Sequence, residues 1–550
     1  MKQDDIQFSR LDYAFSQFLS QRSQLDKEQK KSFESIVLHL SNAQSCGHSC
    51  IKVDKEEQEL LSISGLVDDS GTKPLVLLGR QLYLQRYWNY ECQVAEKIIA
   101  LTTVTAKVKN TDKLIEQYFP DSDDVDWQKE AAKAAIKNPF TIVTGGPGTG
   151  KTTTVVKILA LLQELAMDAS KNPLNIALAA PTGKAAMRLQ ESIGNSKQRL
   201  PSSALIKQLI PEKVVTLHRL LGAKPPSPYF RYNASTPLPY DIIVVDEVSM
   251  IDLALMSKLL SALKQNARLI LLGDKDQLAS VETGTVLADL SQALPAYTQE
   301  LKVSYRFSGN IKNFADKVNA QDAESAWDLL QQEHADVSLL NEDVIHYIVA
   351  KQDAYLQLIK QGASFSECLT AFNAFQVLSA TRKGLYSVED INERVLQQLK
   401  DKQLIQASAV WYAGRPVMIT QNDAVLQLYN GDVGLCMPDA ENNRQLMVFF
   451  LLPDGSIRKY LPSRLSYCET VFAMTIHKSQ GSEFDEVLLL LPEVMNPILT
   501  KELIYTGLTR AKKTLKVLSG KAVFMETLQR KVERFSGLVE RIENSRLGEV

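Results

Sequence analysis

One segment places glycines, a lysine and a threonine at the spacing that binds the phosphates of a nucleotide. Residues 145–152 read GGPGTGKT, follow the apolar run FTIV and precede apolar residues that share one helical face. Glycines let backbone N–H groups curl round a phosphate, and the first turn of a helix adds positive potential. We expect Lys151 to reach the β- and γ-phosphates of ATP and the Thr152 hydroxyl to coordinate Mg²⁺. The whole loop comprises Gly145, Gly146, Pro147, Gly148, Thr149, Gly150, Lys151 and Thr152.

Two acids follow the buried run IIVV, at the place where an ATPase needs them. Asp246 is placed to hold the Mg²⁺ ion, and Glu247 to orient and deprotonate the attacking water. A pure nucleotide switch does not need the second acid, so the pair favours hydrolysis; the alternative is that both acids only cap the next helix. In LLGDKDQ, where another apolar run ends, we expect Gln277 to sense the γ-phosphate and Asp274 to shape the turn.

Length and composition are those of a soluble protein with several domains. At 550 residues the chain exceeds one compact core, and no run of about 18 apolar residues predicts a membrane span. The start, MKQDDIQFSR, lacks an apolar signal core, so we expect a cytoplasmic protein. The net charge of −2 argues against a wholly basic nucleic-acid coat. It does not exclude a DNA motor, because a strand channel needs only a local cationic lining.

Six cysteines are scattered along the chain, which makes a disulfide framework improbable. Cys46, His48 and Cys50 lie close together, with His39 upstream. Zinc requires four ligands, usually as two close pairs, and the second pair is missing here. A turn with buried thiols is therefore favoured over a metal site.

Apolar runs that alternate with amphipathic stretches predict two parallel sheets covered by helices, an α/β fold. The first set of runs is 140–143, 176–180, 242–245 and 269–272, and the second is 375–378, 471–476, 487–491 and 515–518. Between about 405 and 467, short strands are interrupted by Asn430-Gly431 and Asp454-Gly455, both strong hairpin signals. We expect a small antiparallel insertion there, within the second α/β domain.

The first 115 or so residues differ from the rest and favour helices, for example over 11–19 and 33–40. Leu82, Tyr83, Arg86, Tyr87 and Tyr90 recur at helical spacing. This face either packs on its own domain or docks another protein, since aromatic residues and Arg are favoured at the centres of interfaces. The following DSDDVDW, residues 121–127, is typical of a linker.

The order of these motifs resembles that of the superfamily 1 DNA helicases. By that resemblance, Gln128 reads the adenine, and Tyr305 and Arg306 in VSYRF, Glu483 in TIHKSQGSEFDEV and Arg510 in YTGLTRAKK complete the ATP site, with the two arginines reaching it from across the cleft. Arginines that come from across the cleft bring cationic forks to the charge that develops on the phosphate. The alternative for Arg306 and Arg510 is surface salt bridging, and for His218 and His477 a packed core position. The residues that the resemblance assigns to the DNA strand are Thr182, Gly183, Lys184, Thr216, His218, Thr475, His477 and Lys478.

The segments WYAGRPVMITQNDAVLQLYNGDVG and LYLQRYWNYE are similar to the RecD-like branch, the alpha subunits of exodeoxyribonuclease V (RecBCD enzymes). The resemblance implies a 5′-to-3′ motor on single-stranded DNA at a duplex end, in a hetero-oligomer with RecB-like and RecC-like subunits that resects double-strand breaks for repair. It also implies a helical N-terminal domain (1–118) that contacts the RecC-like partner. Two RecA-like P-loop NTPase domains (119–335 and 336–550) follow, the second with a β-rich (SH3-like) insertion at about 405–467.

A metal nuclease needs clustered carboxylates, often with a lysine, around one or two Mg²⁺ ions. No such constellation is found in the sequence outside the ATP site, so we do not expect this chain to cut DNA. Two other classes remain as alternatives to a helicase subunit. A nucleotide-switched assembly factor would not need both sets of strand-contacting motifs. A DNA-binding scaffold without hydrolysis would not need Lys151, Asp246, Glu247 and Arg510 together.

Overall fold

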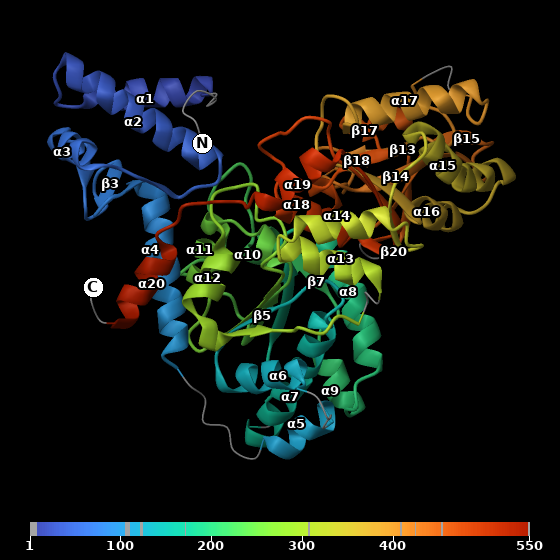
Figure 1. Cartoon of the computed structure of the whole chain (residues 1–550). Coiled ribbons are helices and arrows are strands. Elements are labelled where there is room, and N and C mark those ends of the chain that lie inside the picture. Colours follow the sequence, from blue (N-terminus) through green and yellow to red (C-terminus); the bar gives the residue numbers. More distant parts are fainter. Residues whose placement is uncertain are drawn as a thin grey trace.

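Two parallel sheets covered by helices form the centre of the computed structural model (Figure 1). The structure describes residues 8–104, 111–120, 125–170, 172–305, 309–406, 410–423, 425–452 and 455–547. Within these ranges, no helix is both long and apolar enough to cross a membrane. Because both sheets are parallel and covered by helices, the fold is α/β, with two RecA-like domains.

The sheet of the first motor domain has six strands in the order β10-β5-β9-β8-β6-β7, and every pair is parallel. Strands β5, β6, β8 and β9 confirm the four predicted apolar runs, and burial on both faces explains why those runs do not alternate. The strands are β5 (Phe140–Thr144), β6 (Ile176–Ala180), β7 (Val214–Thr216), β8 (Ile242–Val245), β9 (Arg268–Gly273) and β10 (Thr298–Glu300). The helices are α5 (Asp112–Tyr118), α6 (Trp127–Lys137), α7 (Lys151–Ser170), α8 (Gly183–Gln198), α9 (Ala204–Leu209), α10 (Leu217–Leu221), α11 (Leu253–Ser261) and α12 (Val286–Ala293).

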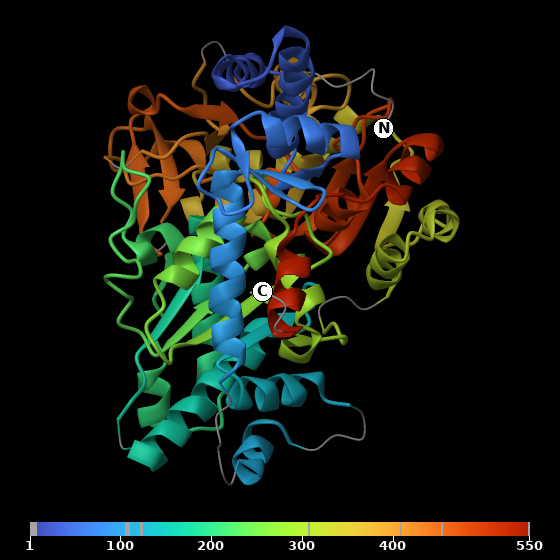
Figure 2. The same cartoon turned by 90° about the vertical axis from the view of Figure 1, so that its left-hand side faces the viewer.

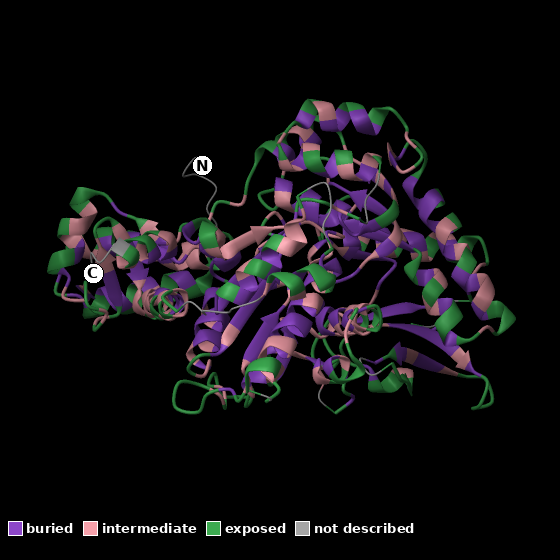
Figure 3. Cartoon of the chain, turned by 90° about the horizontal axis from the view of Figure 1, so that it is seen from below, coloured by how far each residue is buried: buried purple, intermediate pink, exposed green. Residues whose placement is uncertain are grey.

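The sheet of the second motor domain has five parallel strands in the order β11-β20-β19-β12-β18. The strands are β11 (Val337–Leu339), β12 (Phe375–Ser379), β18 (Ala473–Thr475), β19 (Phe484–Leu490) and β20 (Ala511–Leu518). The helices are α13 (Asn310–Asn319), α14 (Ala323–Gln331), α15 (Val344–Gln361), α16 (Phe365–Asn373), α17 (Val388–Asp401), α18 (Lys501–Leu508) and α19 (Lys521–Gln529). Figure 3 shows the buried residues gathered on the sheets, with exposed residues on the outer helices.

The insertion in the second domain is a five-stranded antiparallel sheet. Gly455, at φ +79°, lies in the turn between β15 and β16, and Gly431, at φ +96°, ends the loop 420–432 that precedes β14. Both glycines therefore mark turns between antiparallel strands, although the second connection is longer than a tight hairpin; Asp454 lies outside the described residues. The strands are β13 (Pro416–Ile419), β14 (Val433–Asp439), β15 (Gln445–Leu451), β16 (Ile457–Tyr460) and β17 (Cys468–Thr470).

The N-terminal region has the predicted helices and, in addition, a small sheet that the sequence did not predict. Its helices enclose a four-stranded sheet in the order β1-β4-β3-β2. Leu82 and Tyr83 lie buried in a strand of that sheet and not on a helical face. A short apolar run fits the period of either element, which explains the error. The elements are α1 (Arg10–Arg22), α2 (Lys27–Ser45), β1 (Cys50–Lys52), α3 (Lys55–Ile63), β2 (Val67–Asp68), β3 (Leu75–Leu78), β4 (Gln81–Leu84) and α4 (Gln85–Thr102).

The aromatic residues that follow on α4 are used inside the protein. Tyr87 and Tyr90 pack against the core of the first motor domain, where α4 lies along α11. With these residues the helix therefore packs within the chain, but against the first motor domain and not, as predicted, against its own domain.

Three segments lie with a different domain from the one that the sequence predicted. Helix α5 packs in the core of the first motor domain, whereas α13 and α14 pack in the core of the second. The last helix, α20 (Leu538–Leu547), returns to pack against α4 and α12, as Figure 2 shows for α4. Of the predicted linker 121–127, residues 121–124 lie outside the described part, and Asp126 caps α6.

Candidate active site

The candidate residues of the first motor domain share one edge of its sheet. Because the strands are all parallel, their carboxyl ends meet at that edge. The phosphate loop follows β5, Thr182 follows β6, Thr216 ends β7, Asp246 follows β8 and Asp274 follows β9. Residues far apart in the sequence are thus positioned by neighbouring strands.

The phosphate loop takes a conformation that depends on glycine. Gly150 has φ +83°, and a Cβ there would stand 2.5 Å from Nε2 of Gln128. Gln128 itself donates from Nε2 to the Thr149 carbonyl at 3.3 Å, so the predicted adenine-reading residue lies directly against the loop. Lys151 donates from Nζ to the carbonyls of Gly145 and Gly146, at 2.6 and 3.1 Å, which holds its ammonium inside the curve of the loop.

Helix α7 begins at Lys151, so its first backbone N–H groups have no partner within the helix. These groups and the positive end of the helix face the pocket, where Lys151, Thr152 and Thr153 are part of the lining. The Thr149 hydroxyl donates to the Gly146 carbonyl at 2.9 Å and closes the loop from within. The arrangement suits an anionic phosphate.

The two acids after β8 differ in backbone and environment. Asp246 accepts the Glu247 N–H at 2.9 Å, and Glu247 sits at φ +53°, a left-handed conformation that is rare for this residue type. Burial, followed by the charge of Glu247, raises the pKa of Asp246 to about 6, while Lys151 opposes the shift. A basic group or a cation beside Asp246 therefore favours its ionised form.

The donor set fits a magnesium ion that is shared with a nucleotide. The Thr152 hydroxyl and the Asp246 carboxylate are hard oxygen ligands, and both line the same pocket. Among the described residues, no group of three or more His, Cys, Asp or Glu is placed to hold a metal alone. Mg²⁺ commonly takes one or two protein oxygens and completes its shell with water and phosphate, so the residues present are compatible with it.

Gln277 lies in a buried hydrogen-bond chain between the two motor domains. Its Nε2 donates to Asp274 Oδ2 at 3.0 Å, and the Tyr505 hydroxyl from α18 donates to the same oxygen at 3.1 Å. Burial raises the pKa of Asp274 to about 6, while Lys151 opposes the shift. The loop after β9 therefore touches both halves of the site.

Residues of both motor domains line one cavity of about 1000 Å³, which contains the acids and the phosphate loop. Arg510, only 2% exposed, donates from Nε to the Thr506 carbonyl at 3.0 Å and from Nη1 to the Ser482 carbonyl at 3.3 Å. Burial lowers its pKa, while the charge of Glu247 opposes the shift. Within the described ranges Arg510 makes no ion pair, so the surface salt bridge considered as its alternative role is not what the structure has.

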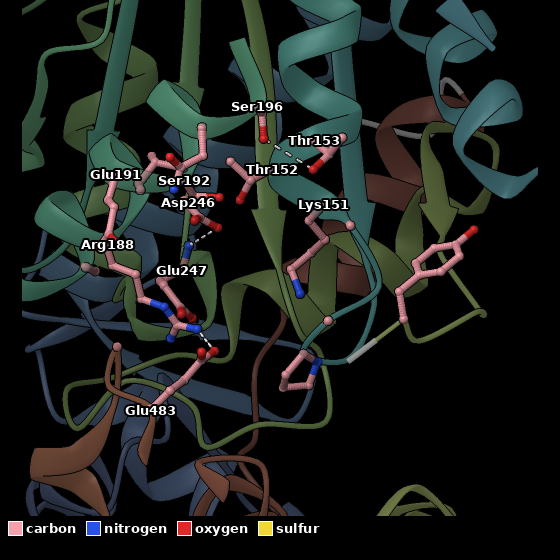
Figure 4. A pocket seen from close by; sticks show the side chains of 18 of the residues that line it. Lys151, Thr152, Thr153, Arg188, Glu191, Ser192, Ser196, Asp246, Glu247 and Glu483 are labelled. Carbon is pink, nitrogen blue, oxygen red and sulfur yellow. Dashed lines mark hydrogen bonds and ion pairs between the residues drawn. The ribbon is translucent and has the colours of Figure 1, made fainter. Parts of the chain in front are cut away.

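The sequence reasoning missed Arg188, which faces the acids from α8. Figure 4 shows its guanidinium directed between Glu247 and Glu483, and it forms an ion pair with Glu483 of the second domain. Burial, followed by the charge of Arg510, lowers the pKa of Arg188 to about 10. Its signal in the sequence was its place four residues after Lys184, on the same side of a helix.

The predicted pair in VSYRF is only partly described. The Tyr305 N–H donates to the Gly148 carbonyl at 2.8 Å, and its side chain is 72% exposed beside the phosphate loop. Such a ring is free to stack on a base. Arg306 lies outside the described residues.

The residues predicted to touch DNA come from both motor domains. Lys184 and Lys478 come from different motor domains. Burial lowers the pKa of Lys184 to about 8, while the charge of Asp432 opposes the shift. The charge of Lys478 adds to the lowering, so the two lysines lie near each other. Lys478 donates from Nζ to Asn430 Oδ1 at 2.5 Å. Asn430 and Asp432, which precede β14 in the insertion, therefore lie next to these lysines.

The threonines of this set cap local structure. Thr182 caps α8 by accepting the Ala185 N–H, Thr216 caps α10, and Thr475 accepts the Lys478 N–H at 3.3 Å. Gly183 has open space where a Cβ would stand, so the backbone there is accessible. His477 is half-buried, and burial lowers its pKa.

Thr216 ends the edge strand β7, which lies beside β6, and His218 is in the short helix α10 that follows. The His218 ring is tilted against Phe230, with 5.8 Å between the centroids, and its side chain is exposed. The structure therefore does not place His218 in the core, and it contacts an aromatic residue of the long loop before β8.

The cysteine and histidine cluster near residue 48 has a structural use. His48 stacks on Phe535, with 5.3 Å between ring centroids, and its Nδ1 accepts the Phe535 N–H at 2.9 Å. Cys50 is buried in β1 and Cys46 is exposed. The part of the chain that the structure describes holds no group of three or more metal-ligating residues, and His48 serves to fix the C-terminal tail.

A glycine-rich loop, an acid pair and an arginine from a second RecA-like domain define a two-domain P-loop ATPase. Residues 128–283 match the AAA domain family, and residues 470–518 match the UvrD-like helicase C-terminal domain. The two matches fall on the two halves of the cleft.

Comparison with curated proteins gives the particular family. The chain is 36% identical to RecBCD enzyme subunit RecD of Haemophilus influenzae, over 91% of this chain and 84% of that protein. It is 39% identical to RecBCD enzyme subunit RecD of Mycolicibacterium smegmatis, over 86% and 84%. It is 32% identical to the ATP-dependent RecD2 DNA helicase of Deinococcus radiodurans, over 73% of this chain and 50% of that protein. The chain belongs to the RecD family and is an ATP-dependent DNA helicase.

Proposed function

We propose that this chain is the 5′-to-3′ single-strand motor of a RecBCD-type complex that resects double-strand breaks for recombinational repair. The observation that carries the proposal is the single cavity in which the phosphate loop and acid pair of one domain face Arg510 and Glu483 of the other. Relatives named RecBCD enzyme subunit RecD support the assembly. Such a complex works on DNA in the cytoplasm.

In the proposed ATP site, Lys151 and the start of α7 bind the phosphates, and Gln128 and Tyr305 hold the base. A bound Mg²⁺ ion would be held by Thr152 and Asp246 and would neutralise charge on the phosphates. Glu247 takes the proton of the attacking water, while Arg510 and Arg306 bring positive charge to the γ-phosphate and Gln277 senses it. Because Arg510 comes from the second domain, closure of the cleft completes the site.

In the proposed strand path, Lys184 and Lys478 contact phosphates from opposite motor domains. The capped backbone turns at Thr182 and Thr475, with Gly183 and His477, offer further donors beside them. Thr216 and His218 continue the path at β7. Opening and closing of the cleft then moves one contact set relative to the other, which is how hydrolysis pulls the strand.

The N-terminal region is proposed to dock the RecC-like partner, through α1 in place of the aromatic face of α4. Leu11 and Phe18, one face of α1, are 75% and 50% exposed, while Asp12 and Ser16 on the opposite face are buried. Arg22 stacks over the Phe18 ring at 3.6 Å. An exposed apolar stripe with an arginine at its end is the kind of surface that another protein covers.

The docking proposal is tested with Leu11→Glu plus Phe18→Glu in a pull-down against RecB-like and RecC-like subunits. We expect loss of the complex, whereas Val494→Glu, a change at a residue 76% exposed on the second domain, should leave it intact. Retention of the partners by the double variant would refute docking through α1. We propose that DNA cutting resides in another subunit, because no constellation of carboxylates with a lysine, as a metal nuclease requires, is found in the sequence outside the ATP site.

The motor proposal is tested by unwinding of duplexes that carry a 5′ or a 3′ single-stranded tail, with the isolated chain and with its partners. We expect unwinding from the 5′ tail, together with ATP hydrolysis that single-stranded DNA stimulates. Unwinding from 3′ tails alone would overturn the polarity. Absence of DNA-stimulated hydrolysis in the presence of the partners would overturn the motor itself.

A further inference from the structure

The loop that carries Gln277 continues away from the ATP site and ends between two distant parts of the chain. This β9–α12 loop comprises residues 274–285. Its first half is held by the second motor domain, since Leu278 N–H donates to Thr506 Oγ1 at 2.9 Å and Gln480 Nε2 donates to the Leu278 carbonyl at 3.4 Å. Its second half is held to α11 of the first motor domain, where the Leu253 N–H donates to the Thr283 carbonyl at 3.0 Å, and by two more distant segments of the chain.

One of the two holders is the C-terminal tail, residues 530–537, through Arg534. The guanidinium donates from Nη2 to the Ser280 carbonyl at 2.8 Å, and from Nη1 to the carbonyls of Glu282 and Gly284 at 2.9 and 3.0 Å. A planar fork that spans three carbonyls fixes the curvature of a loop as a point charge cannot. Arg534 forms no ion pair among the described residues, and its buried Nε has no hydrogen-bond partner there, so its contacts in this region are with backbone carbonyls.

The other holder is the end of α2 in the N-terminal region. The Gly284 N–H donates to the Gly47 carbonyl at 2.9 Å, and the Thr283 hydroxyl donates to the Gln44 carbonyl at 3.2 Å. Gly47 has φ +90°, and a Cβ there would lie 2.4 Å from Cζ of Arg534. The absence of a side chain at Gly47 is thus what lets the guanidinium reach the loop.

The tail is anchored on both sides of Arg534. Toward the second motor domain, the Val532 N–H donates to Glu502 Oε2 at 3.1 Å at the start of α18. Toward the N-terminal region, the Ser49 N–H donates to the Phe535 carbonyl at 3.0 Å, and the buried Glu91 accepts the Gly537 N–H at 3.2 Å. Figure 2 shows the last helix, in red, beside α4, in blue. The tail therefore ties both motor domains to the N-terminal region at the β9–α12 loop.

We infer that Arg534 is a positioning residue for ATP hydrolysis, and that it acts through the β9–α12 loop on Gln277. Only two residues separate Ser280 from Gln277, a reach of at most about 11 Å, so displacement of the Ser280 carbonyl shifts the Gln277 amide. The same contacts give the N-terminal region a route to the ATP site, because Gln44 and Gly47 hold the loop jointly with Arg534. This inference rests on the proposed role of Gln277 in hydrolysis.

The test compares Arg534→Ala with Gln277→Ala and with the double variant, in the full chain with its partners, by DNA-stimulated ATP hydrolysis. We expect Arg534→Ala to lower kcat about tenfold, with KM for ATP and the Kd for single-stranded DNA changed by less than about twofold. The double variant should be no slower than Gln277→Ala alone, because both changes act on one group. Arg534→Lys should recover part of kcat, since an ammonium still donates to the loop.

Arg530→Ala is the matched control in the same tail, because the Arg530 side chain forms its ion pair among the described residues with the exposed Glu526 one turn earlier, at 2.6 Å. It should keep the kcat of the unmodified chain. If Arg534→Ala fails to fold, Arg534→Lys and Gly47→Ala carry the test, since a Cβ at Gly47 pushes the guanidinium off the loop; each should lower kcat in the same non-additive way. A kcat within about twofold of the unmodified chain, or losses that multiply in the double variant, would overturn the inference. A normal kcat in Gln277→Ala alone would overturn both it and the proposed role of Gln277, while leaving the motor proposal standing.

Discussion

The two motor domains share an architecture but divide the chemistry between them. Each has a parallel sheet with one edge at the cavity, formed by the carboxyl ends of the strands in the first domain and by the residues just before β19 and β20 in the second; of the two, only the first has a glycine-rich loop and an acid pair there. The second contributes Arg510 and Glu483. Arg510 donates to backbone carbonyls of its own domain, and Glu483 forms an ion pair with Arg188 of the first domain. The difference teaches that the first domain is built to bind a nucleotide, and the second to respond to one.

In each half of the site, a cation is held by carbonyls of its own domain. Lys151 is held by carbonyls of its own loop, and Arg510 by carbonyls of its own domain. Variants in the two halves should therefore have different effects. Changes in the first domain should weaken nucleotide binding, whereas changes in the second should slow hydrolysis of the bound nucleotide. Four predictions test this division, starting with the largest effect.

Lys151→Gln should reduce DNA-stimulated ATP hydrolysis by about 10³-fold or more, and should also weaken nucleotide binding, because the loop loses its only side-chain cation. Initial rates of phosphate release and the binding of a fluorescent nucleotide measure the two effects. The control is Lys133→Gln on α6, where the lysine is exposed and pairs with Glu130 at 2.7 Å. Hydrolysis in Lys151→Gln at even a tenth of the normal rate would contradict the assignment.

Arg510→Ala should lower kcat by about 10³-fold, because it removes a cation from the developing charge of the phosphate. Nucleotide affinity should change by only about threefold, since the first domain still binds the phosphates. A melting temperature measured in parallel separates this effect from loss of a buried side chain. An equal loss of affinity and of kcat would show that the second domain also binds the ground state, and the division between the domains would fail.

Arg188 and Glu483 should be coupled across the cleft. Removing either should slow hydrolysis about tenfold, and the double change Arg188→Ala plus Glu483→Ala should cost little more than one alone. The measurement is a double-mutant cycle on kcat/KM. Additive losses would mean that the ion pair has no part in closing the cleft.

The smallest effect concerns pH and the lysine pair. Burial holds the pKa of Lys184 at about 8, and only the protonated amine attracts a phosphate, so affinity for single-stranded DNA should fall as pH rises above that value. Between pH 7 and pH 9 we expect a Kd about five- to tenfold weaker, measured by fluorescence anisotropy at constant salt. Lys184→Arg stays charged, so its Kd should be flat over the same range. An equally steep change in that variant would place the titrating group elsewhere.

Much of the fold followed from local signals that the tertiary structure did not need to modify. Runs that are apolar throughout, such as Ile242–Val245, predicted strands covered on both faces, and they form such strands. The phosphate loop needs glycine at fixed places, so its conformation could be predicted from its sequence. The prediction for Gln81–Leu84 was wrong, because these four residues fit a helix as well as a strand. They form a strand, which pairs with β1 and β3.

The sequence also did not predict which domain some helices pack against. Helices α13 and α14 have ordinary amphipathic patterns that say which face is buried, but not against which sheet. The core they joined belongs to the second motor domain. The same limit explains why the return of α20 to α4 was not foreseen.

The sequence by itself determined the chemistry of this protein, because phosphate binding and acid-assisted hydrolysis demand particular residues at short spacing: Gly145 to Thr152, and Asp246 beside Glu247. Only the tertiary structure decided which distant groups meet them. Arg188 lies between Glu247 and Glu483, and Arg534 grips the loop of Gln277 from the far end of the chain. Such pairings depend on how two sheets and a tail pack together, and long-range packing leaves no fixed spacing in a sequence.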